Sequence, residues 1–424
     1  MYSKLSENNH IMVVAGALLA LSGCFTVDER TSASLDDSSI ATASEDIAEE
    51  DSGVGGSESE SDSGSDSGSD SSSESDGAVD TGTTGDTLAI DLQPEVTISE
   101  QGTYPRAAER TDGTLFVAYE GPLGDEKALL VAKSDNGGLS WSEAGVIAHD
   151  LAEVDLANPM LIERPNEGLL VAYRRHDQVD SDYVYRLLVS ELLGNQTSWQ
   201  FKGEIEIDVT APRIWEPFLL QLPDNQLQVY YAREPAFEGD QQIVMRRSFD
   251  DAQSWGMQQD MTVVASMVGS REGMPSATVM ADGNLLVVFE SFRNPGDSHF
   301  VIRSVESTDG GLGWSDQQDV YVPVDPMANA GAPCVTTLAD GRLLVSFMTD
   351  EDSLAHDWPG HASVKLMVSD GVPGAGTLSW HELGVTIAAP ADAFWPAVLG
   401  LEDGGFLVTY DRGGPKARRG ALVD

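Results

Sequence analysis

Two glutamates of this chain stand where a charge is costly. Glu216 lies between Trp215 and Pro217 at the start of an apolar segment, and Glu290 directly follows the apolar segment 285–289. A carboxylate beside a buried strand is unfavourable unless it is paired or carries out chemistry. Two carboxyl groups near aromatic rings suit the cleavage of a glycosidic bond, in which one protonates the leaving oxygen and the other acts as nucleophile or base. We therefore predict that Glu216 and Glu290 form a catalytic pair.

Charged and aromatic residues surround this pair in a repeated pattern, next to a proline or after an alternating apolar segment. From them we predict the substrate-binding residues Tyr104, Arg106, Arg213, Trp215, Arg271, Trp395, Tyr410 and Arg412. Aromatic faces stack on sugar rings, and guanidinium groups donate several hydrogen bonds at once. Two other roles stay open. A solvated rim carries similar charges, and Glu216 could instead form an ion pair with Arg213 or Arg271.

The elements that must position these residues come from a sixfold repeat. Each unit has a proline, a short apolar segment, a turn such as Asp-Gly, and an alternating apolar segment. The prolines recur about every 60 residues, at Pro105, Pro159, Pro217, Pro275, Pro333 and Pro396. Five tryptophans recur in phase with them, at Trp141, Trp199, Trp255, Trp314 and Trp380. A period of this length with several short strands per unit predicts a β-propeller.

Each unit of the repeat reads as four strands, so we predict an all-β fold of six four-stranded antiparallel blades. In the fourth unit the first two strands are expected at 277–280 and 285–289. In the third unit the last two are expected at 243–247 and 261–264. The sixth unit ends early, with room only for a short third strand near 421–423. We expect the N-terminal strand 96–98 to complete it, which removes a free sheet edge.

This topology predicts where the chemistry lies. The first strand begins and the second strand ends at the same face of every blade, so the residues before the prolines and after the second strands converge on one funnel. The tryptophan motifs form the turn between the third and fourth strands, at the opposite face. The motif 307–314 and its relatives 134–141 and 248–255 resemble the Asp box, or BNR repeat, of the sialidase superfamily. Their aspartates are therefore expected to stabilise the turn.

The middle of the chain carries a closer resemblance. The segments 213–219, 228–232, 271–275 and 288–290 resemble blades three and four of the exo-α-1,5-arabinanases, six-bladed retaining glycoside hydrolases related to sialidases. The other blades share only the fold. The resemblance implies that Glu216 and Glu290 are the paired catalytic glutamates, and it predicts an exo-acting glycoside hydrolase that acts on arabinan-like or related glycans.

Two alternatives stay open. A sialidase would need an arginine triad for the sialate carboxylate, for which Arg106, Arg271 and Arg412 are available, and a tyrosine nucleophile such as Tyr410. The sialidase motif Arg-Ile-Pro, however, places its arginine before the proline, whereas Arg106 follows Pro105. The second alternative is a non-catalytic propeller that binds a glycan or a protein, which would need the aromatic residues but not the two glutamates.

The N-terminal part of the chain is expected to be an anchor and a tether. Residues 1–24 resemble a bacterial lipoprotein signal peptide that ends at Cys24, the predicted lipidation site. Residues 25–91 contain 19 acidic residues and one arginine, which predicts a disordered linker. The propeller is expected at 92–424. We thus predict an extracytoplasmic protein anchored by its lipid to a bacterial membrane, at the outer membrane or the cell surface.

The charge and the cysteines limit the partners. A net charge of −46 argues against binding to nucleic acid, and the membrane is expected to be contacted only through the N-terminal lipid. The partner that we expect is a glycan substrate, and we expect a monomer without cofactor or metal. The Asp- and His-containing loop 350–361 is interpreted as part of the rim. Cys334 is expected to be a buried, unreactive thiol.

Overall fold

The computed structural model describes residues 89–423, except 166–167, 180–181, 195, 210–212, 235–239, 257–259, 268, 295, 371–377, 385 and 389–391. All regular elements in this part of the chain are β-strands. No helix among these residues is long and apolar enough to cross a membrane. The predicted signal peptide, the lipidation site Cys24 and nearly all of the predicted tether lie outside the described residues.

The strands form six antiparallel sheets, so the predicted six-bladed β-propeller is confirmed. Blade one contains β3 (Thr103–Glu109), β4 (Leu115–Leu123), β5 (Glu126–Ser134) and β6 (Ser142–Leu151). Blade two contains β7 (Asp155–Glu163), β8 (Leu169–Val179), β9 (Asp182–Leu192) and β10 (Gln200–Val209). Blade three contains β11 (Ile214–Gln221), β12 (Leu227–Arg233), β13 (Gln242–Ser248) and β14 (Met261–Val264). Blade four contains β15 (Gly273–Val279), β16 (Leu285–Phe292), β17 (Phe300–Ser307) and β18 (Gln318–Tyr321). Blade five contains β19 (Ala330–Thr337), β20 (Leu343–Thr349), β21 (Ser363–Ser369) and β22 (Trp380–Glu382).

Blade six is closed by the N-terminal segment, as predicted. Its strands β23 (Phe394–Gly400), β24 (Phe406–Asp411) and β25 (Pro415–Val423) are followed by β1 (Ala89–Leu92) and β2 (Val96–Thr97), which both pair with β25. Two expectations were wrong in detail. The third strand spans Pro415–Val423 instead of a short stretch near 421–423, and the first strand begins at Ala89, before the expected boundary at 92. Ile90 and Leu92 pack against the core between blades five and six, which explains the earlier start.

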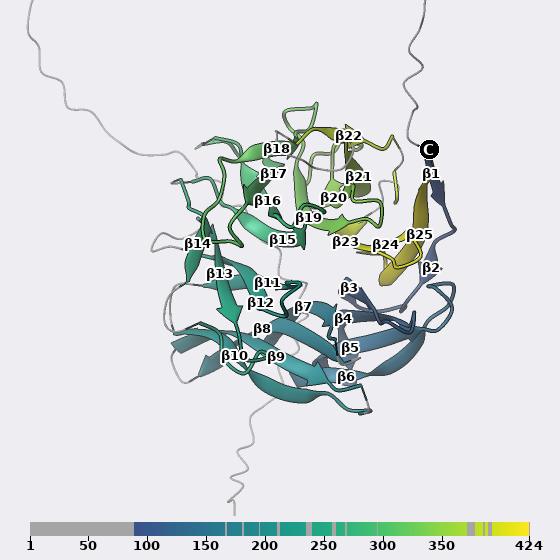
Figure 1. Cartoon of the computed structure of the whole chain (residues 1–424), viewed down its shortest axis with the longest axis vertical. Coiled ribbons are helices and arrows are strands. Elements are labelled where there is room, and N and C mark those ends of the chain that lie inside the picture. The colour runs from purple at the N-terminus through teal and green to yellow at the C-terminus, as the bar shows by residue number, and fades with distance from the viewer. Residues whose placement is uncertain are drawn as a thin grey trace, which may run out of the picture. The chain divides into compact units, whose positions relative to one another are not determined.

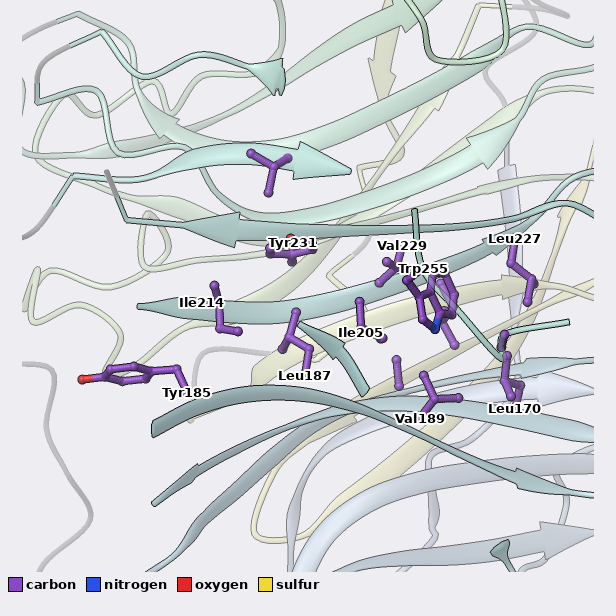
Figure 2. Packing of buried hydrophobic residues seen from close by; sticks show 14 residues of the cluster. Leu170, Tyr185, Leu187, Val189, Ile205, Ile214, Leu227, Val229, Tyr231 and Trp255 are labelled. Atoms are coloured by element: carbon purple, nitrogen blue, oxygen red, sulfur yellow. The ribbon is translucent and has the colours of Figure 1, made fainter. Parts of the chain in front are cut away.

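The first strands of the six blades, β3, β7, β11, β15, β19 and β23, contact one another in a closed cycle, and Figure 1 shows them around the centre of the propeller. Apolar side chains fill the space between neighbouring sheets. Figure 2 shows one such cluster, in which Leu170 and Val189 of blade two pack against Val229 and Trp255 of blade three. Trp255 ends an Asp-box motif, so the motif contributes to this packing.

The Asp boxes hold turns. Asp309 Oδ1 accepts hydrogen bonds from the N–H groups of Leu312 and Gly313, both at 2.9 Å. Asp250 accepts equivalent bonds from the N–H and the hydroxyl of Ser254 at 2.9 and 2.5 Å. Both carboxylates therefore stabilise the turn between the third and fourth strands, at the face opposite the funnel.

The repeated prolines lie inside the first strands, not before them as expected, and each marks a β-bulge. In every blade the pairing between the first and second strands shifts across the proline and the residue before it. The six residues before the prolines have positive φ angles: Tyr104 54°, Asn158 51°, Glu216 37°, Met274 51°, Ala332 49° and Trp395 51°. A non-glycine residue pays about 1–2 kcal/mol for this conformation. A bulge changes the direction of a side chain that would otherwise alternate between the two faces of the sheet. In this protein the change occurs at the equivalent position of the first strand in all six blades.

Candidate active site

The six residues before the prolines form the centre of the candidate site, and we call them the pre-proline ring. Blades one to three contribute the polar members Tyr104, Asn158 and Glu216. Blades four to six contribute the members Met274, Ala332 and Trp395. Five of the six are buried and Trp395 is partly buried. Tyr104, Met274 and Ala332 pack in one cluster with Trp395 at its edge, so the ring converges across the propeller axis. The half of the ring from blades one to three can bind polar groups of a ligand, and the half from blades four to six can pack against an apolar face of it.

Glu216 lies in the polar half of the ring. Its side chain is 4% exposed, and it lines a small pocket together with Tyr104 and Met274. Burial raises the pKa of Tyr104 to about 12, and the negative charge of Glu216 acts in the same direction. Tyr104 is therefore a neutral hydroxyl group close to the Glu216 carboxylate at neutral pH.

Glu290 reaches the ring from blade four. It was expected to follow the second strand but lies within β16, where its side chain is 4% exposed. Its Oε2 accepts a hydrogen bond from the N–H of Ala332 at 2.8 Å. Since Ala332 and Met274 are neighbours in the ring and Glu216 is the next member beyond Met274, the two predicted catalytic carboxylates lie on either side of Met274.

Two glycines leave the space that the Glu290 carboxylate occupies. A Cβ atom on Gly331 would lie 2.6 Å from Glu290 Oε2 and 2.8 Å from Trp358 Cζ2. A Cβ atom on Gly273 would lie 2.8 Å from Gln241 Oε1 and 3.4 Å from Glu290 Oε1. A side chain at Gly331 would displace the Glu290 carboxylate, and one at Gly273 would displace the neighbouring Gln241 side chain. The site therefore depends on glycines as well as on polar residues.

The position of Glu290 is repeated in every blade. In each blade one residue of the second strand pairs with the residue just before the bulge. From blade one to blade six these residues are Glu120, Arg174, Ala232, Glu290, Met348 and Asp411. In three blades its side chain accepts the N–H of the ring residue of the next blade. Glu120 Oε1 binds the N–H of Asn158 at 2.9 Å, and Met348 Sδ binds that of Trp395 at 3.4 Å, as Glu290 does for Ala332. Burial raises the pKa of Glu120 above its ordinary value, while the charge of Lys127 opposes this.

Glu120, Asn158 and Arg174 occupy positions that were predicted to converge on the funnel, but they were not among the predicted site residues. Arg174 stacks on Trp215, with its guanidinium carbon 4.9 Å from the ring centroid. The sequence pattern placed all three at the funnel, and the register of the second strand against the bulge distinguishes them from the other residues there.

The predicted aromatic residues lie at the ring. Trp215 directly precedes Glu216, contacts His176 edge-on at 5.2 Å between ring centroids, and donates its Nε1–H to Glu234 at 3.1 Å. Trp395 and Tyr104 are 6.3 Å apart between ring centroids. Both tryptophans can offer part of a face to a sugar ring.

The predicted arginines are held in different ways. Arg106 is 5% exposed, donates to the carbonyl groups of Pro105 and Trp395 at 2.9 and 3.0 Å, and lies 3.8 Å from the Tyr104 ring centroid. It faces the axial cavity of about 320 Å³ that the first strands enclose. Arg213 pairs with Glu234 at 2.9 Å. Arg271 lies 5.7 Å from the Phe300 ring centroid.

Tyr410 and Arg412 are not brought to the ring. Tyr410 is fully buried in the core between blades five and six, and its hydroxyl donates to Glu95 at 2.5 Å. Arg412 pairs with the same carboxylate at 2.8 Å. Glu95 lies in the connection between β1 and β2, the strands at the outer edge of blade six, so both side chains are turned away from the axis.

No group of three or more His, Cys, Asp or Glu side chains within the described residues is arranged to hold a metal ion. In the blade-five loop His356 contacts Asp325 at 3.5 Å and His361 contacts Asp357 at 3.7 Å. Cys334 is buried in β19 as a free thiol.

Sequence comparison with protein-family models and with curated proteins gives no match. Comparison with solved structures gives several similar folds. The α-L-arabinanase of Penicillium chrysogenum with arabinobiose is 18% identical, with a TM-score of 0.60 over 79% of this chain and 98% of that one. The GH93 α-L-arabinofuranosidase of Fusarium graminearum with arabinobiose is 17% identical, with a TM-score of 0.58 over 78% of this chain and 98% of that one.

A third similar structure is the NanB sialidase of Streptococcus pneumoniae. It is 10% identical, with a TM-score of 0.51 over 80% of this chain and 70% of that one. At these identities the likeness concerns the fold. The chain therefore has the propeller fold of the two kinds of protein that its motifs resemble, arabinan-degrading hydrolases and sialidases.

Proposed function

We propose that this protein is an exo-acting glycoside hydrolase for arabinan-like or related neutral glycans, with Glu216 and Glu290 as its catalytic pair. The observation that carries the proposal is the placement of two carboxylates, each 4% exposed, on either side of Met274 in a ring that is half polar and half apolar. The similar folds of an arabinanase and an arabinofuranosidase, both solved with arabinobiose, support this choice of sugar.

The proposed chemistry needs only groups at the ring. One carboxylic acid gives its proton to the oxygen of the leaving sugar, and the other carboxylate attacks the anomeric carbon or activates water. The neutral Tyr104 hydroxyl can hydrogen-bond the reacting sugar beside Glu216. The apolar half of the ring can pack against the less polar face of the sugar.

The arrangement of the arginines favours a neutral sugar over sialate. A sialidase needs three guanidinium groups that converge on one carboxylate. Here Arg106 donates to two backbone carbonyl groups, and Arg412 pairs with Glu95 at the outer strand of blade six. The tyrosine considered for that mechanism, Tyr410, is buried in the core.

The test is sugar release by the full chain from linear α-1,5-arabinan, sialyllactose and a panel of plant and microbial glycans. Glu216→Gln and Glu290→Gln are each expected to lower the release of arabinose by a factor of about 100 or more. Glu143→Gln, an exposed residue of β6, is the control and should leave the rate unchanged. Release of sialic acid instead would support the sialidase alternative, and a wild-type chain that binds but cleaves no glycan would support a binding propeller.

We further propose that the chain is exported and anchored to a bacterial membrane by a lipid on Cys24, with the acidic segment as a spacer. The lipobox-like sequence before Cys24 and the 19 acidic residues of 25–91 support this. Cys24→Ser is expected to move the protein from the membrane fraction to the soluble fraction of cells that express it. Equal membrane association of both forms would rule out the lipid anchor.

A further inference from the structure

We propose that Asn158 and Arg174 of blade two form the subsite that hydrogen-bonds the hydroxyl groups of the sugar next to Glu216. This inference rests on the proposed function and extends it to residues that neither the motifs nor the comparisons assign. Asn158 is the ring member between Tyr104 and Glu216. Arg174 has the same position in its second strand as Glu290 has in blade four, where the side chain reaches the ring residue of the next blade. For Arg174 the ring residue of the next blade is Glu216.

Asn158 presents a buried acceptor that the described part of the chain does not satisfy. Its side chain is 5% exposed, and its Oδ1 has no hydrogen-bond partner among the described residues. The backbone around it is fixed, because its N–H is bound by Glu120 Oε1 at 2.9 Å and its φ angle is 51°. Leaving such a group without a partner is unfavourable, so the Asn158 acceptor needs an explanation, and a bound ligand group would supply the missing partner.

Arg174 presents unused donors beside this acceptor. One terminal nitrogen, Nη2, pairs with Asp155 at 2.9 Å, while Nε and Nη1 are buried and have no partner among the described residues. The planar group is held over Trp215. Asn158 and Arg174 also lie on paired strands, since Ala157 pairs with Arg174. An acceptor and two donors without partners among the described residues thus lie on neighbouring strands of one blade.

The charge around Arg174 suits hydroxyl groups better than an acid. Asp155 already pairs with the guanidinium, and its pKa is lowered chiefly by the charge of Arg174, against the effect of burial. Burial lowers the pKa of the neighbouring His176 to about 3, so this imidazole is neutral and adds no positive charge. A compensated guanidinium can donate to a neutral hydroxyl oxygen, while a sugar carboxylate would prefer an uncompensated one.

The test compares the hydrolysis of 4-nitrophenyl α-L-arabinofuranoside with that of its 2-, 3- and 5-deoxy analogues. Asn158→Gly is the informative variant, because glycine adopts a φ of 51° readily while it removes the amide. We expect kcat/KM of the variant on the full sugar to fall about 10- to 100-fold. With the wild-type chain, kcat/KM should fall by the same factor for the deoxy sugar that lacks the bound hydroxyl. With the variant, kcat/KM for that deoxy sugar should be no lower than for the full sugar.

The controls separate binding from structure. Asn158→Asp keeps an acceptor and should restore part of the rate, and Arg174→Met should show the same non-additive loss with one deoxy sugar. Arg175→Met removes the next arginine of β8, which pairs with Asp150 at 2.7 Å, and should leave kcat/KM unchanged. If the wild-type chain is active but the variants lower kcat/KM by the same factor on all three deoxy sugars as on the full sugar, the blade-two subsite is wrong. The proposed function would then still stand. A wild-type chain that cleaves no arabinofuranoside would overturn the proposed function and this subsite together.

Discussion

The Glu290 carboxylate depends on a neighbouring glycine for its place, which gives a sharp test at the level of one atom. In Gly331→Ala the added Cβ would lie 2.6 Å from Glu290 Oε2 and 2.8 Å from Trp358, so the carboxylate or the indole must move. A displacement of about 1 Å at a catalytic group can lower the rate about 100-fold. We expect arabinose release to fall by that order, with a loss of stability of about 1–3 kcal/mol from overpacking.

The matched control for this prediction is Gly203→Ala in β10, where a Cβ would meet no atom within 4 Å. It should leave both the rate and the melting temperature close to those of the wild-type chain. Full activity of Gly331→Ala would mean that the position of the Glu290 carboxylate is not critical for the reaction.

Glu272 makes a separate prediction about pH. This carboxyl group is fully buried next to Gly273, and burial raises its pKa to about 7 from the ordinary value of 4.5. Between these two pH values the unfolded chain has released this proton while the folded chain keeps it, so stability falls as pH rises through this window. The loss is complete above about pH 7 and amounts to ~3 kcal/mol.

Glu272→Gln should remove this contribution. Urea unfolding of both forms at several pH values from 4.5 to 8 measures it, and the variant should gain stability relative to the wild-type chain as the pH rises. A difference that stays constant across the range would mean that Glu272 titrates alike in the folded and unfolded chains.

Single residues also show how far the sequence could lead to the site. Glu216 and Glu290 could be selected because each is a charge at the margin of an apolar segment. Asn158 and Arg174 were also at positions predicted to face the funnel, but only the bulge register and their missing hydrogen bonds distinguish them from the other residues there. Tyr410 and Arg412 were placed at the funnel by strand order, yet their side chains point outward to Glu95, a partner far away in the sequence.

At the scale of the element, the bulge around each proline is the device that forms the ring. The sequence pattern located the prolines and the strands, and 261–264 agrees with β14 as observed. It missed that the first strands begin before the prolines, because a run with a proline inside reads as a strand boundary. The pairing of β25 over its whole length was missed for a similar reason, since the basic residues 416–419 do not look like a strand.

The strain of the bulge can be measured with two alanines of β19. Ala332 has a φ angle of 49°, while Ala330, two residues earlier in the same strand, is not among the residues with positive φ. Both are 0% exposed. Glycine relieves the strain only at the first, so Ala332→Gly should be nearly neutral while Ala330→Gly should lose about 1 kcal/mol. Equal losses in urea unfolding would show that the bulge carries no strain at this residue.

At the scale of the whole molecule, the number of blades was predictable because the repeat is directly visible in the sequence. Six prolines and five tryptophans in phase determine six units, and the short sixth unit indicates that a strand must come from elsewhere. The exact start of that strand was not predictable, because Ala89–Leu92 follows directly on a segment rich in acidic residues. Only its packing shows that Ile90 and Leu92 belong to the core.

The closure of the ring by the N-terminal segment makes the last prediction. The segment covers the edge of β25, buries part of Ile90 and Leu92, and brings Glu95 to Tyr410 and Arg412. A chain that begins at residue 99 loses the partly buried side chains of Ile90, Leu92 and Val96, the buried side chain of Ile98 and two charge-assisted hydrogen bonds. Together these contribute roughly 5 kcal/mol, which is a large share of the stability of a typical domain.

A chain that begins at residue 89 keeps all these contacts and is the control. We expect it to melt at the temperature of the full chain, while the shorter chain melts well below it and associates as its concentration rises, because the exposed edge of β25 can pair with another copy. Thermal unfolding and sedimentation of the two forms measure both effects. If the shorter chain were monomeric and equally stable, blade six would be complete with three strands, and the N-terminal segment would contribute nothing to closing the propeller.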